Sequence, residues 1–435
     1  MKHFTFRTKN LIIALTATFL FSAYSAKSVN PIHVSGKYII GSDGDTLTFY
    51  GVNYPVYNWG YTTSENYFPE IAKTHSNAVR IPWYAYSSLP AYSSISYLDS
   101  AISRALRYKM IPIIELHNET SQPADSLVNL LPYYKQAAFL NLEIKYRRDL
   151  IINIANEVGY YAWDQSSTAD LDDYRNSYIN TVDSLRKYGI KVPLMIDAPD
   201  GGSNADVIDS EGAKILKADP LKNIIFSIHG YWESFANNDS ATMAQKVASL
   251  YNTGLAVHFG EVSTEQDGNT ACQYTLNYKA LLNILEKYKI GWTAWVWIGD
   301  NCSGRQMTTN GAYSSLTSFG DYITGITKNA KTALDLTGTA TGLDAIENNN
   351  LEVDVYPNPF SSVTNIRYQL DKPADVYMEI TDMNGKTIAV IKKSKSESGT
   401  YTEQFNASTF QCRQGIYFLK FVAGNTVIMK KLEVL

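Results

Sequence analysis

Between Pro31 and Leu334, short apolar runs alternate with longer amphipathic segments. Each run is continuous rather than alternating, as expected of strands buried on both faces of a parallel sheet. The segments between the runs, such as Ala169–Tyr188, Ala241–Tyr251 and Tyr274–Tyr288, have helical patterns. The predicted strands are Phe49–Asn53, Ala78–Pro82, Ile111–His117, Leu150–Asn156, Pro193–Asp197, Ile224–Tyr231, Ala256–Glu261 and Gly291–Trp297.

Eight strand–helix units in about 300 residues predict an α/β fold, a (β/α)8 TIM barrel over residues 31–334. An open doubly wound sheet is the alternative, but no glycine-rich phosphate loop follows the first predicted strand. A hairpin with strands at Lys37–Ile40 and Thr46–Tyr50 precedes the barrel strands. We expect this hairpin to close the barrel floor.

The pattern changes to a period of two from Leu351, which predicts a small all-β antiparallel sandwich over residues 351–435. Residues 335–350 are rich in Thr, Gly and Asn and predict a linker. Within the sandwich, Asn384-Gly385 predicts a tight hairpin turn. The predicted strands include Val376–Thr381, Thr387–Ile391, Tyr401–Asn406, Ile416–Val422 and Thr426–Leu432.

The first 25 residues predict a secretory signal peptide. Basic residues come first, an apolar stretch follows over Leu11–Phe21, and small residues stand at Ala23 and Ser25. The stretch is too short to span a bilayer, so we expect export and no membrane span. Export permits a disulfide, and Cys272 and Cys302, on neighbouring predicted loops, are the expected pair. Cys412 is expected to be a small, buried, unpaired side chain.

Net charge and composition say little about which class of molecule the protein binds. The formal net charge of -4 gives no reason to expect nucleic acid. The chain has 32 Tyr, 16 Phe and 7 Trp, and aromatic planes pack well on sugar rings, although ordinary packing explains most of them. Composition therefore leans towards a carbohydrate partner.

Polar residues gather at the predicted carboxyl ends of the barrel strands, where TIM barrels hold their active sites. Two of them, Glu157 and Glu261, suit glycosidic bond cleavage, in which one carboxyl is protonated and the other ionised. Alone, a glutamate at a strand end is as readily a structural ion-pair partner. Their separation, which distinguishes retention from inversion of the anomeric centre, is not given by the sequence.

The motifs around these glutamates resemble glycoside hydrolase family 5, in the retaining barrel clan of cellulases and mannanases. The resemblance rests on Ile152–Glu157, Phe259–Glu261, Val79–Ile81, Leu116-His117, Phe226–Tyr231 and Gly291–Trp295. It implies that Glu157 is the acid/base and Glu261 the nucleophile. It also implies that Asn156 binds the sugar 2-hydroxyl, and that Arg80 and Tyr231 orient Glu261 and keep it ionised.

Three further residues follow from the resemblance. His117 and His229 would bind the sugar in subsite −1 and support the glutamates, and Trp295 would be its stacking platform. Trp297 lies two residues further on and should share the same side of the strand. Core packing or zinc are the other interpretations of the histidines, but the family needs no metal or cofactor and we expect none.

Other acidic residues are weaker candidates because they lack the motif context. Glu115 is expected to share a layer with His117 and to hold Arg80. Those that could line subsites or lie on loops beyond the strand ends are Glu119, Asp197, Glu233 and Glu265.

The substrate is expected to be a β-1,4-linked polysaccharide attacked internally. The segments Pro193–Ala198 and Ala218–Asn223 resemble bacterial endo-β-1,4-mannanases. Those enzymes usually carry Trp directly after the acid/base, where this chain has Val158, which alters the predicted +1 side. A long cleft is suggested by rim-loop aromatics, namely Tyr54, Trp59, Trp83, Tyr84, Tyr86 and Trp232.

On this pattern we expect a secreted, retaining endo-β-1,4-glucanase, with an endo-β-1,4-mannanase as the alternative. A non-catalytic glycan-binding surface protein is a third interpretation, and a transglycosylase would share every residue named. We expect a monomer.

The C-terminal segment resembles the sorting domain of the type IX secretion system. The resemblance rests on Val355–Phe360, Asp382–Lys386 and Gly415–Lys420. It implies that the secretion machinery is a partner and that the protein is secreted or lies at the cell surface. A carbohydrate-binding module is the alternative for this domain.

Overall fold

The computed structural model describes residues 31–56, 66–88, 93–160, 168–231, 239–266, 272–328, 353–370, 372–382, 386–423 and 426–435. The chain divides into two compact units, Met1–Gly338 and Thr339–Leu435. The predicted signal peptide, the linker, Asn384-Gly385, Trp59, Trp232 and Glu233 lie outside the described residues. The division falls inside the predicted linker, residues 335–350.

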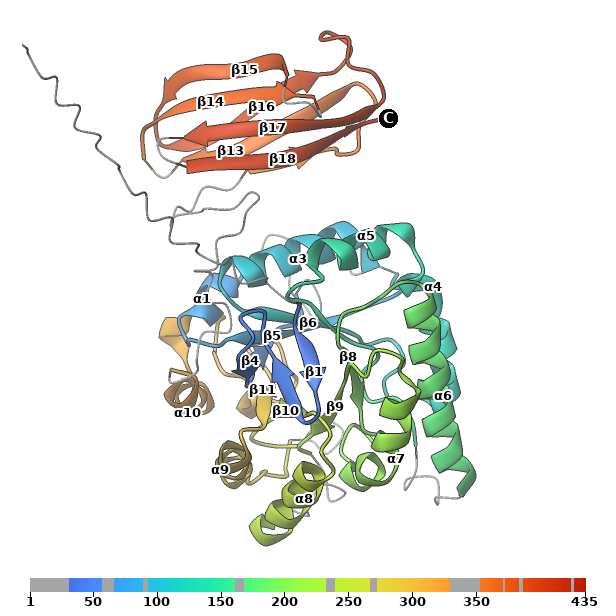
Figure 1. Cartoon of the computed structure of the whole chain (residues 1–435). Helices are drawn as coiled ribbons and strands as arrows, with labels where there is room; N and C mark the ends of the chain where they lie inside the picture. Colours follow the sequence, from blue (N-terminus) through green and yellow to red (C-terminus); the bar gives the residue numbers. More distant parts are fainter. Residues whose placement is uncertain are drawn as a thin grey trace, which may run out of the picture. The chain divides into compact units, whose positions relative to one another are not determined.

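A closed parallel barrel forms the first unit, as predicted (Figure 1). Its strands are paired in the order β10-β11-β4-β5-β6-β7-β8-β9, which closes the ring. The fold class is therefore confirmed. The strands are β4 Tyr50–Asn53, β5 Ala78–Trp83, β6 Ile111–Leu116, β7 Ile151–Asn153, β8 Leu194–Asp197, β9 Ile224–His229, β10 Val257–Val262 and β11 Gly291–Ala294.

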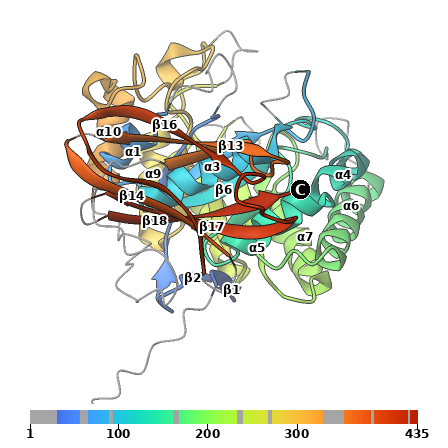
Figure 2. The same cartoon turned by 90° about the horizontal axis from the view of Figure 1, so that it is seen from above.

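Helices surround the strands, and each buries one stripe of its surface. In α3, Leu98, Ala101, Ile102 and Ala105 are buried, which is the spacing of one helical face. The neighbouring helices α6 and α7 lie side by side outside the barrel (Figures 1 and 2). The helices are α1 Phe68–Ala72, α3 Ile95–Arg107, α4 Leu131–Tyr134, α5 Ala137–Tyr146, α6 Thr168–Lys187, α7 Ala205–Ala218, α8 Ser240–Asn252, α9 Tyr278–Tyr288 and α10 Ser318–Thr327.

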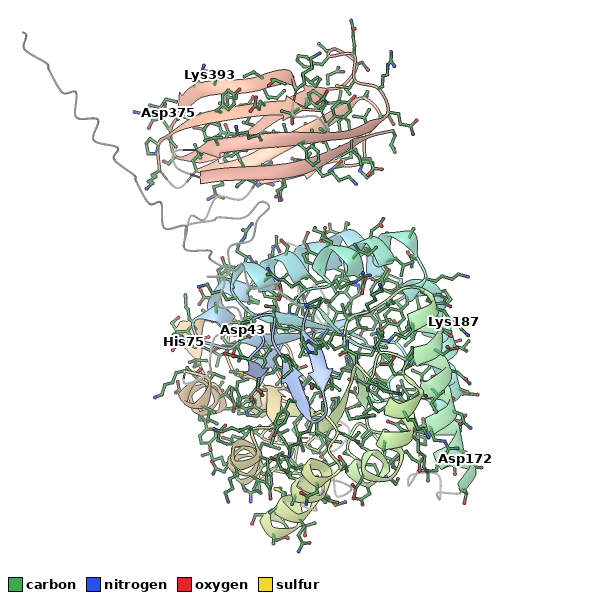
Figure 3. The ribbon with its side chains drawn as sticks, in the orientation of Figure 1. Asp43, His75, Asp172, Lys187, Asp375 and Lys393 are labelled. Carbon is green, nitrogen blue, oxygen red and sulfur yellow. A yellow bond between two sulfur atoms is a disulfide. The ribbon has the colours of Figure 1, made fainter. Side chains whose placement is uncertain are left out.

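Charged side chains cover the outer face of the helical layer. On α6, Asp172 and Lys187 point outward (Figure 3). Both side chains are about half exposed or more and pair within their own helix, with Arg175 and Asp183 respectively. Such exposed pairs contribute little to stability. The fold therefore depends on the apolar face of each helix.

The barrel floor is closed by a small antiparallel sheet. Its strands are β1 His33–Ser35, β2 Tyr38–Ile40 and β3 Thr46–Leu47. Ile39 and Leu47 pack in one buried cluster with Ile113 and Ile225 from the barrel strands. The predicted floor hairpin is confirmed, with one additional strand. The floor is thus filled with apolar side chains. The active sites of TIM barrels lie at the opposite rim, where the polar side chains gather.

The second unit contains two antiparallel sheets around its own core. One sheet has the order β12-β13-β16 and the other β15-β14-β17-β18. Cys412 is a free thiol, as expected, but it packs against the core half-buried rather than fully buried. The strands are β12 Val353–Tyr356, β13 Val363–Leu370, β14 Ala374–Thr381, β15 Thr387–Ser396, β16 Gly399–Asn406, β17 Gly415–Ala423 and β18 Thr426–Val434.

A disulfide joins Cys272 to Cys302, as predicted. It links the loop that follows β10 to the loop that follows β11. Among the described residues, none of the helices has the length and apolarity needed to cross a bilayer.

The contact between β4 and β5 generates a test of barrel packing. A Cβ atom on Gly51 would lie 2.1 Å from the carbonyl oxygen of Ala78, and this backbone cannot move aside without breaking the sheet. We expect G51A to lower the free energy of unfolding by about 3 kcal/mol. Urea unfolding followed by tryptophan fluorescence reports the barrel alone, because all 7 Trp lie in residues 59–297.

The matched control is G325A, since a Cβ atom added to Gly325 in α10 would have no neighbouring atom within 4 Å. There the same substitution should stabilise the helix by about 0.5–1 kcal/mol. Equal unfolding midpoints for G51A and the unmodified protein would contradict the close packing of β4 on β5.

Candidate active site

One arginine lies at the centre of the polar rim. Arg80, on β5, is fully buried, and its guanidinium donates to Glu261 Oε1 at 2.8 Å and to Asn156 Oδ1 at 2.7 Å. It also donates to the side-chain oxygens of Asn53 and Asn153, each at 3.0 Å. Burial disfavours the cation, but the surrounding carboxylates outweigh burial and raise the pKa of Arg80. Arg80 is therefore permanently charged.

Two more carboxylates compensate the positive charge of Arg80. Glu115 on β6 and Asp197 on β8 lie 3.6 and 3.5 Å from Arg80 Nη2, and all three side chains are inaccessible to solvent. The expectation that Glu115 holds Arg80 is confirmed. Asp197, a candidate subsite residue on the sequence pattern, does not line the cavity. Its side chain is fully buried against Arg80 and His229, and it accepts the backbone N–H of Glu157 at 3.1 Å.

Glu261 is held at both oxygens. Besides the Arg80 bond to Oε1, the Tyr231 hydroxyl donates to Oε2 at 2.9 Å. Burial raises the pKa of Tyr231 well above its ordinary value, so the phenol stays protonated and remains a donor. Burial also raises the pKa of Glu261, and the charges of His229 and Arg80 oppose that rise. The carboxylate is thus fixed in one orientation.

Glu157 follows β7 in a left-handed backbone conformation with φ of 49°. This conformation is unfavourable for a residue with a side chain, by about 1 kcal/mol or more, and occurs where the surrounding structure enforces it. Here Asp197 accepts its N–H and the Ser121 N–H donates to its carbonyl oxygen. The turn explains why β7 ends at Asn153, before the predicted end at Asn156.

His229 connects the two glutamates. Its Nδ1 lies 2.6 Å from Glu157 Oε1 and 3.6 Å from Glu261 Oε1. Burial disfavours its protonation, but the carboxylates of Glu261, Asp197 and Glu157 outweigh burial and raise the pKa of His229 to about 9. Protonated His229 in turn lowers the pKa of Glu157, against the effect of burial. At neutral pH the pair therefore holds one proton, on His229.

The ring of His229 fits only because two glycines flank it. A Cβ atom on Gly202 would lie 2.5 Å from His229 Cγ, and one on Gly260 would lie 3.0 Å from Nε2. Gly202 also has φ of 74°, which favours glycine. The motif glycine directly before Glu261 thus makes room for the histidine that bridges the glutamates.

Both glutamates open into one cavity of about 130 Å³. Single oxygen atoms of Glu157 and Glu261 and a ring nitrogen of His229 all lie within 4.8 Å of one another. The predicted residues that the cavity brings together are Glu157, Glu261, His117, Asn156, Tyr231 and Trp295, whereas Arg80 and His229 lie buried behind its wall. Thr120, Gln266 and Arg305 complete the lining.

Trp295 and His117 form one side of the cavity. Their rings are nearly parallel, at 17°, with centroids 6.4 Å apart. Burial disfavours protonation of His117, but the Glu115 carboxylate 3.2 Å away outweighs burial and raises its pKa. The prediction that Trp297 shares this side is wrong. The strand β11 ends at Ala294, so the period-two rule no longer applies, and Trp297 is fully buried in the barrel core.

The sequence pattern missed the lining residues Thr120, Gln266 and Arg305, and Asp300 behind them. All four lie on long loops after strands, where no period constrains the side chain. The two remaining acidic candidates that the structure describes, Glu119 and Glu265, do not line the cavity. Glu119 is buried and accepts the hydroxyl of Tyr86, and Glu265 lies beside the disulfide.

Two groups of side chains have the donor atoms of a metal site among the described residues. In the first, Glu265, Cys272 and Cys302, the two sulfurs are bonded to each other and offer no thiolate. The second is Glu157, His229 and Glu261. There His229 already occupies the space between the carboxylates as a proton donor, so its Nδ1 is not a free ligand atom.

The raised pKa of His229 predicts how stability depends on pH. A pKa of about 9 in the folded protein, against about 6.5 unfolded, means that protonation favours the folded state. This contribution is complete below about pH 6.5 and is lost as pH rises through about 9. We expect the difference in unfolding free energy between the unmodified protein and H229N to shrink between these values. A constant difference, measured by urea unfolding at each pH, would contradict a charged His229.

Comparison with known proteins agrees with this geometry. Residues 40–301 match the cellulase family, glycosyl hydrolase family 5. Residues 354–434 match the secretion system C-terminal sorting domain, so the predicted sorting domain and the secreted or cell-surface location are confirmed.

Two curated relatives align with most of the barrel. A mannan endo-1,4-beta-mannosidase from Salipaludibacillus agaradhaerens is 29% identical over 62% of this chain and 82% of its own length. Another from Cellvibrio japonicus (strain Ueda107) is 28% identical, covering 73% of this chain and 71% of the relative.

Among solved structures, a beta-mannanase from Streptomyces thermolilacinus superposes with a TM-score of 0.59. It is 20% identical, and the match covers 70% of this chain and 98% of the other, which supports the barrel fold. Because the family match spans more than half of the chain, this protein belongs to glycosyl hydrolase family 5 and is a glycoside hydrolase.

Proposed function

We propose that the protein is a retaining, endo-acting β-1,4-glycanase in which Glu261 is the nucleophile and Glu157 the acid/base, and that its substrate is a β-1,4-mannan. The observation that carries the proposal is that one oxygen of Glu157 and one of the buried Glu261 lie within 4.8 Å of each other at one cavity. Retaining glycosidases hold their carboxyl groups about 5–5.5 Å apart, whereas inverting enzymes need about 6.5–9.5 Å to admit water. The short separation supports retention.

The first chemical step forms a bond between a Glu261 oxygen and the anomeric carbon while the glycosidic bond breaks. Arg80 and Tyr231 each hold one oxygen of this carboxylate, at 2.8 and 2.9 Å, so its direction of attack is set before the sugar arrives. Asn156, on the cavity wall, is proposed to bind the sugar 2-hydroxyl, with its own orientation fixed by Arg80 and Thr120.

The departing sugar oxygen needs a proton, which Glu157 is proposed to deliver. The free site keeps that proton on His229, 2.6 Å from Glu157 Oε1. Its transfer across this hydrogen bond protonates Glu157 and leaves a neutral imidazole. After departure, the Glu157 carboxylate takes a proton from water, and the resulting hydroxide adds to the anomeric carbon and frees Glu261.

Mannan is preferred to glucan on two grounds. Both curated relatives named above act, by their names, on mannan, and two segments of this chain resemble mannanases. The argument for glucan rested on Val158. That side chain is fully buried in the barrel core rather than on the cavity wall, so Val158 itself offers no surface to a sugar. The endoglucanase expectation is not confirmed.

Two conservative substitutions test the catalytic roles. We expect E261Q to lower kcat on β-1,4-mannan by at least about 1000-fold, because an amide cannot form the glycosyl–enzyme bond. E157Q should lose as much on polysaccharide but far less on an aryl glycoside, whose leaving group needs no proton. The control is E286Q, on the outer helix α9. Activity of E261Q within about tenfold of the unmodified enzyme would eliminate the assignment, and a non-catalytic protein would be inactive throughout.

A substrate panel tests the polymer preference. We expect kcat/KM on galactomannan to exceed that on carboxymethyl cellulose by at least about tenfold, measured as reducing ends released. Internal cleavage should lower the viscosity of the polymer well before monosaccharide appears. The reverse preference would restore the glucanase interpretation, and longer products formed in the presence of acceptor sugar would identify a transglycosylase.

A further inference from the structure

Arg305 is a cavity-lining residue that the proposed mechanism does not use. It ends the short helix η4 Ser303–Arg305, on the loop after β11, and its side chain is only 7% exposed. Burying a guanidinium is costly unless it is paired and solvated by polar atoms. This cation nevertheless lies at the cavity that receives the sugar.

The flat guanidinium of Arg305 packs on two aromatic residues of the cavity. Its central carbon lies 5.3 Å from the ring centre of Tyr231 and 5.8 Å from that of Trp295. A cation at this distance from a ring centre is attracted by the face of the ring, and a guanidinium carries five N–H donors in one plane. Tyr231 is the residue whose hydroxyl donates to Glu261, and Trp295 is the proposed sugar platform.

Asp300 contacts both Arg305 and Trp295, which form one wall of the cavity. One of its oxygens accepts Trp295 Nε1 at 2.7 Å and lies 3.2 Å from Arg305 Nη2. The other accepts the backbone N–H of Cys302 at 2.7 Å. A single carboxylate therefore sets the positions of the cation and the indole relative to each other.

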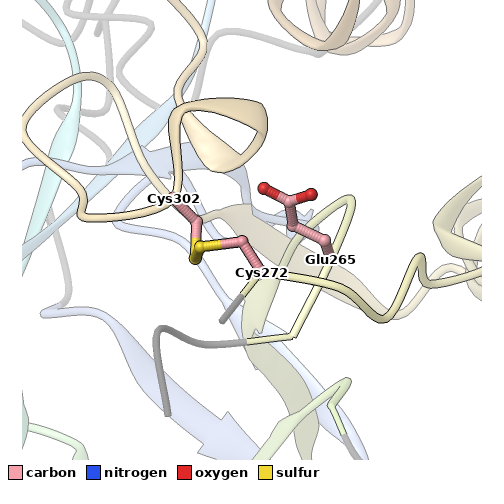
Figure 4. A group of neighbouring side chains, drawn as sticks. All are labelled: Glu265, Cys272 and Cys302. Carbon is pink, nitrogen blue, oxygen red and sulfur yellow. A yellow bond between two sulfur atoms is a disulfide. The ribbon is translucent and has the colours of Figure 1, made fainter. Parts of the chain in front are cut away.

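The disulfide anchors the same wall to the loop that follows the nucleophile strand. Figure 4 shows Cys272 and Cys302 joined across the two loops, with the Glu265 side chain beside them. The backbone carbonyl of Gln266, another lining residue, lies 3.7 Å from Cys302 Sγ. Glu265 packs so closely on Gly304 that a Cβ atom there would lie 2.5 Å from its carboxylate. The loops after β10 and β11 thus meet at the disulfide.

We propose that Arg305 is a substrate-binding residue of this enzyme, whose guanidinium donates hydrogen bonds to hydroxyl oxygens of the bound β-1,4-glycan. Asp300 and the Cys272–Cys302 disulfide are positioning groups that hold Arg305 and Trp295 in place. This inference rests on the proposed function. It deepens that function by assigning a polar contact to a wall of the cavity that is built from two loops rather than from strand ends.

A hydroxyl-rich, uncharged ligand suits this site. The planar fork of guanidinium N–H donors matches the neighbouring oxygens of a sugar ring. Because the contact forms with the substrate before bond cleavage, its loss should weaken ground-state binding more than the chemical step. A purely structural Arg305 would instead affect stability and leave sugar binding unchanged.

The test compares R305M and R305K with the unmodified enzyme in the full chain. We expect R305M to raise KM on galactomannan about tenfold with kcat within about threefold, and R305K to recover part of the loss. R175M is the matched control, since Arg175 forms ion pairs with Asp172 and Glu211 on the outer helices, away from the cavity. The C272S/C302S double variant should raise KM in the same direction.

Binding is measured separately, by calorimetry of mannotetraose and cellotetraose on E261Q, with and without R305M. A Kd about tenfold weaker in the double variant supports the inference. An unchanged Kd and unchanged KM in R305M, with or without lower stability, would overturn it. If E261Q binds tetrasaccharide but the unmodified enzyme cleaves no β-1,4-glycan, the proposed function fails while the Arg305 contact still stands or falls on the Kd comparison. If E261Q binds neither tetrasaccharide, both are wrong.

Discussion

A buried positive charge under the barrel rim organises the site. Arg80 contacts Glu261 directly, has Glu115 and Asp197 within 3.6 Å, and holds Asn156 at the cavity wall. Removing one partner of such a network typically costs about 3–5 kcal/mol because it leaves other charges buried and uncompensated. The carboxylates therefore cannot relax independently. The orientation of Glu261, the backbone turn at Glu157 and the position of Asn156 all follow from how these charges satisfy one another.

The second organising element is the proton shared by His229 and Glu157. Three carboxylates around one imidazole raise its pKa to about 9, and the close approach of Gly202 and Gly260 fixes the ring between them. In the proposed mechanism one mobile proton serves both glutamates, since Glu261 acts as a carboxylate while Glu157 delivers a proton. The barrel makes this possible because strands β7, β9 and β10 end at the same rim.

Much of this site could be predicted from the sequence, because barrel strands bring their carboxyl ends together whatever the loops do. Glu157, Glu261, His229 and Tyr231 followed from that rule and from the family motifs. Trp297 did not, because β11 ends before it and the strand period stops. Arg305, Asp300 and Gln266 could not be predicted at all. They lie on loops whose path depends on a disulfide and on packing against distant residues. The sequence likewise does not show that the Val158 side chain points into the core, because Val158 follows the end of β7.

The central claim is that the two glutamates act on one anomeric carbon from within 4.8 Å of each other. Proton NMR of the first products released from a β-1,4-mannan, recorded before mutarotation, tests this most directly. The account predicts that the new reducing ends appear as the β-anomer and equilibrate slowly to the mixture. Initial appearance of the α-anomer would mean direct attack by water, and would contradict a glycosyl–enzyme intermediate on Glu261.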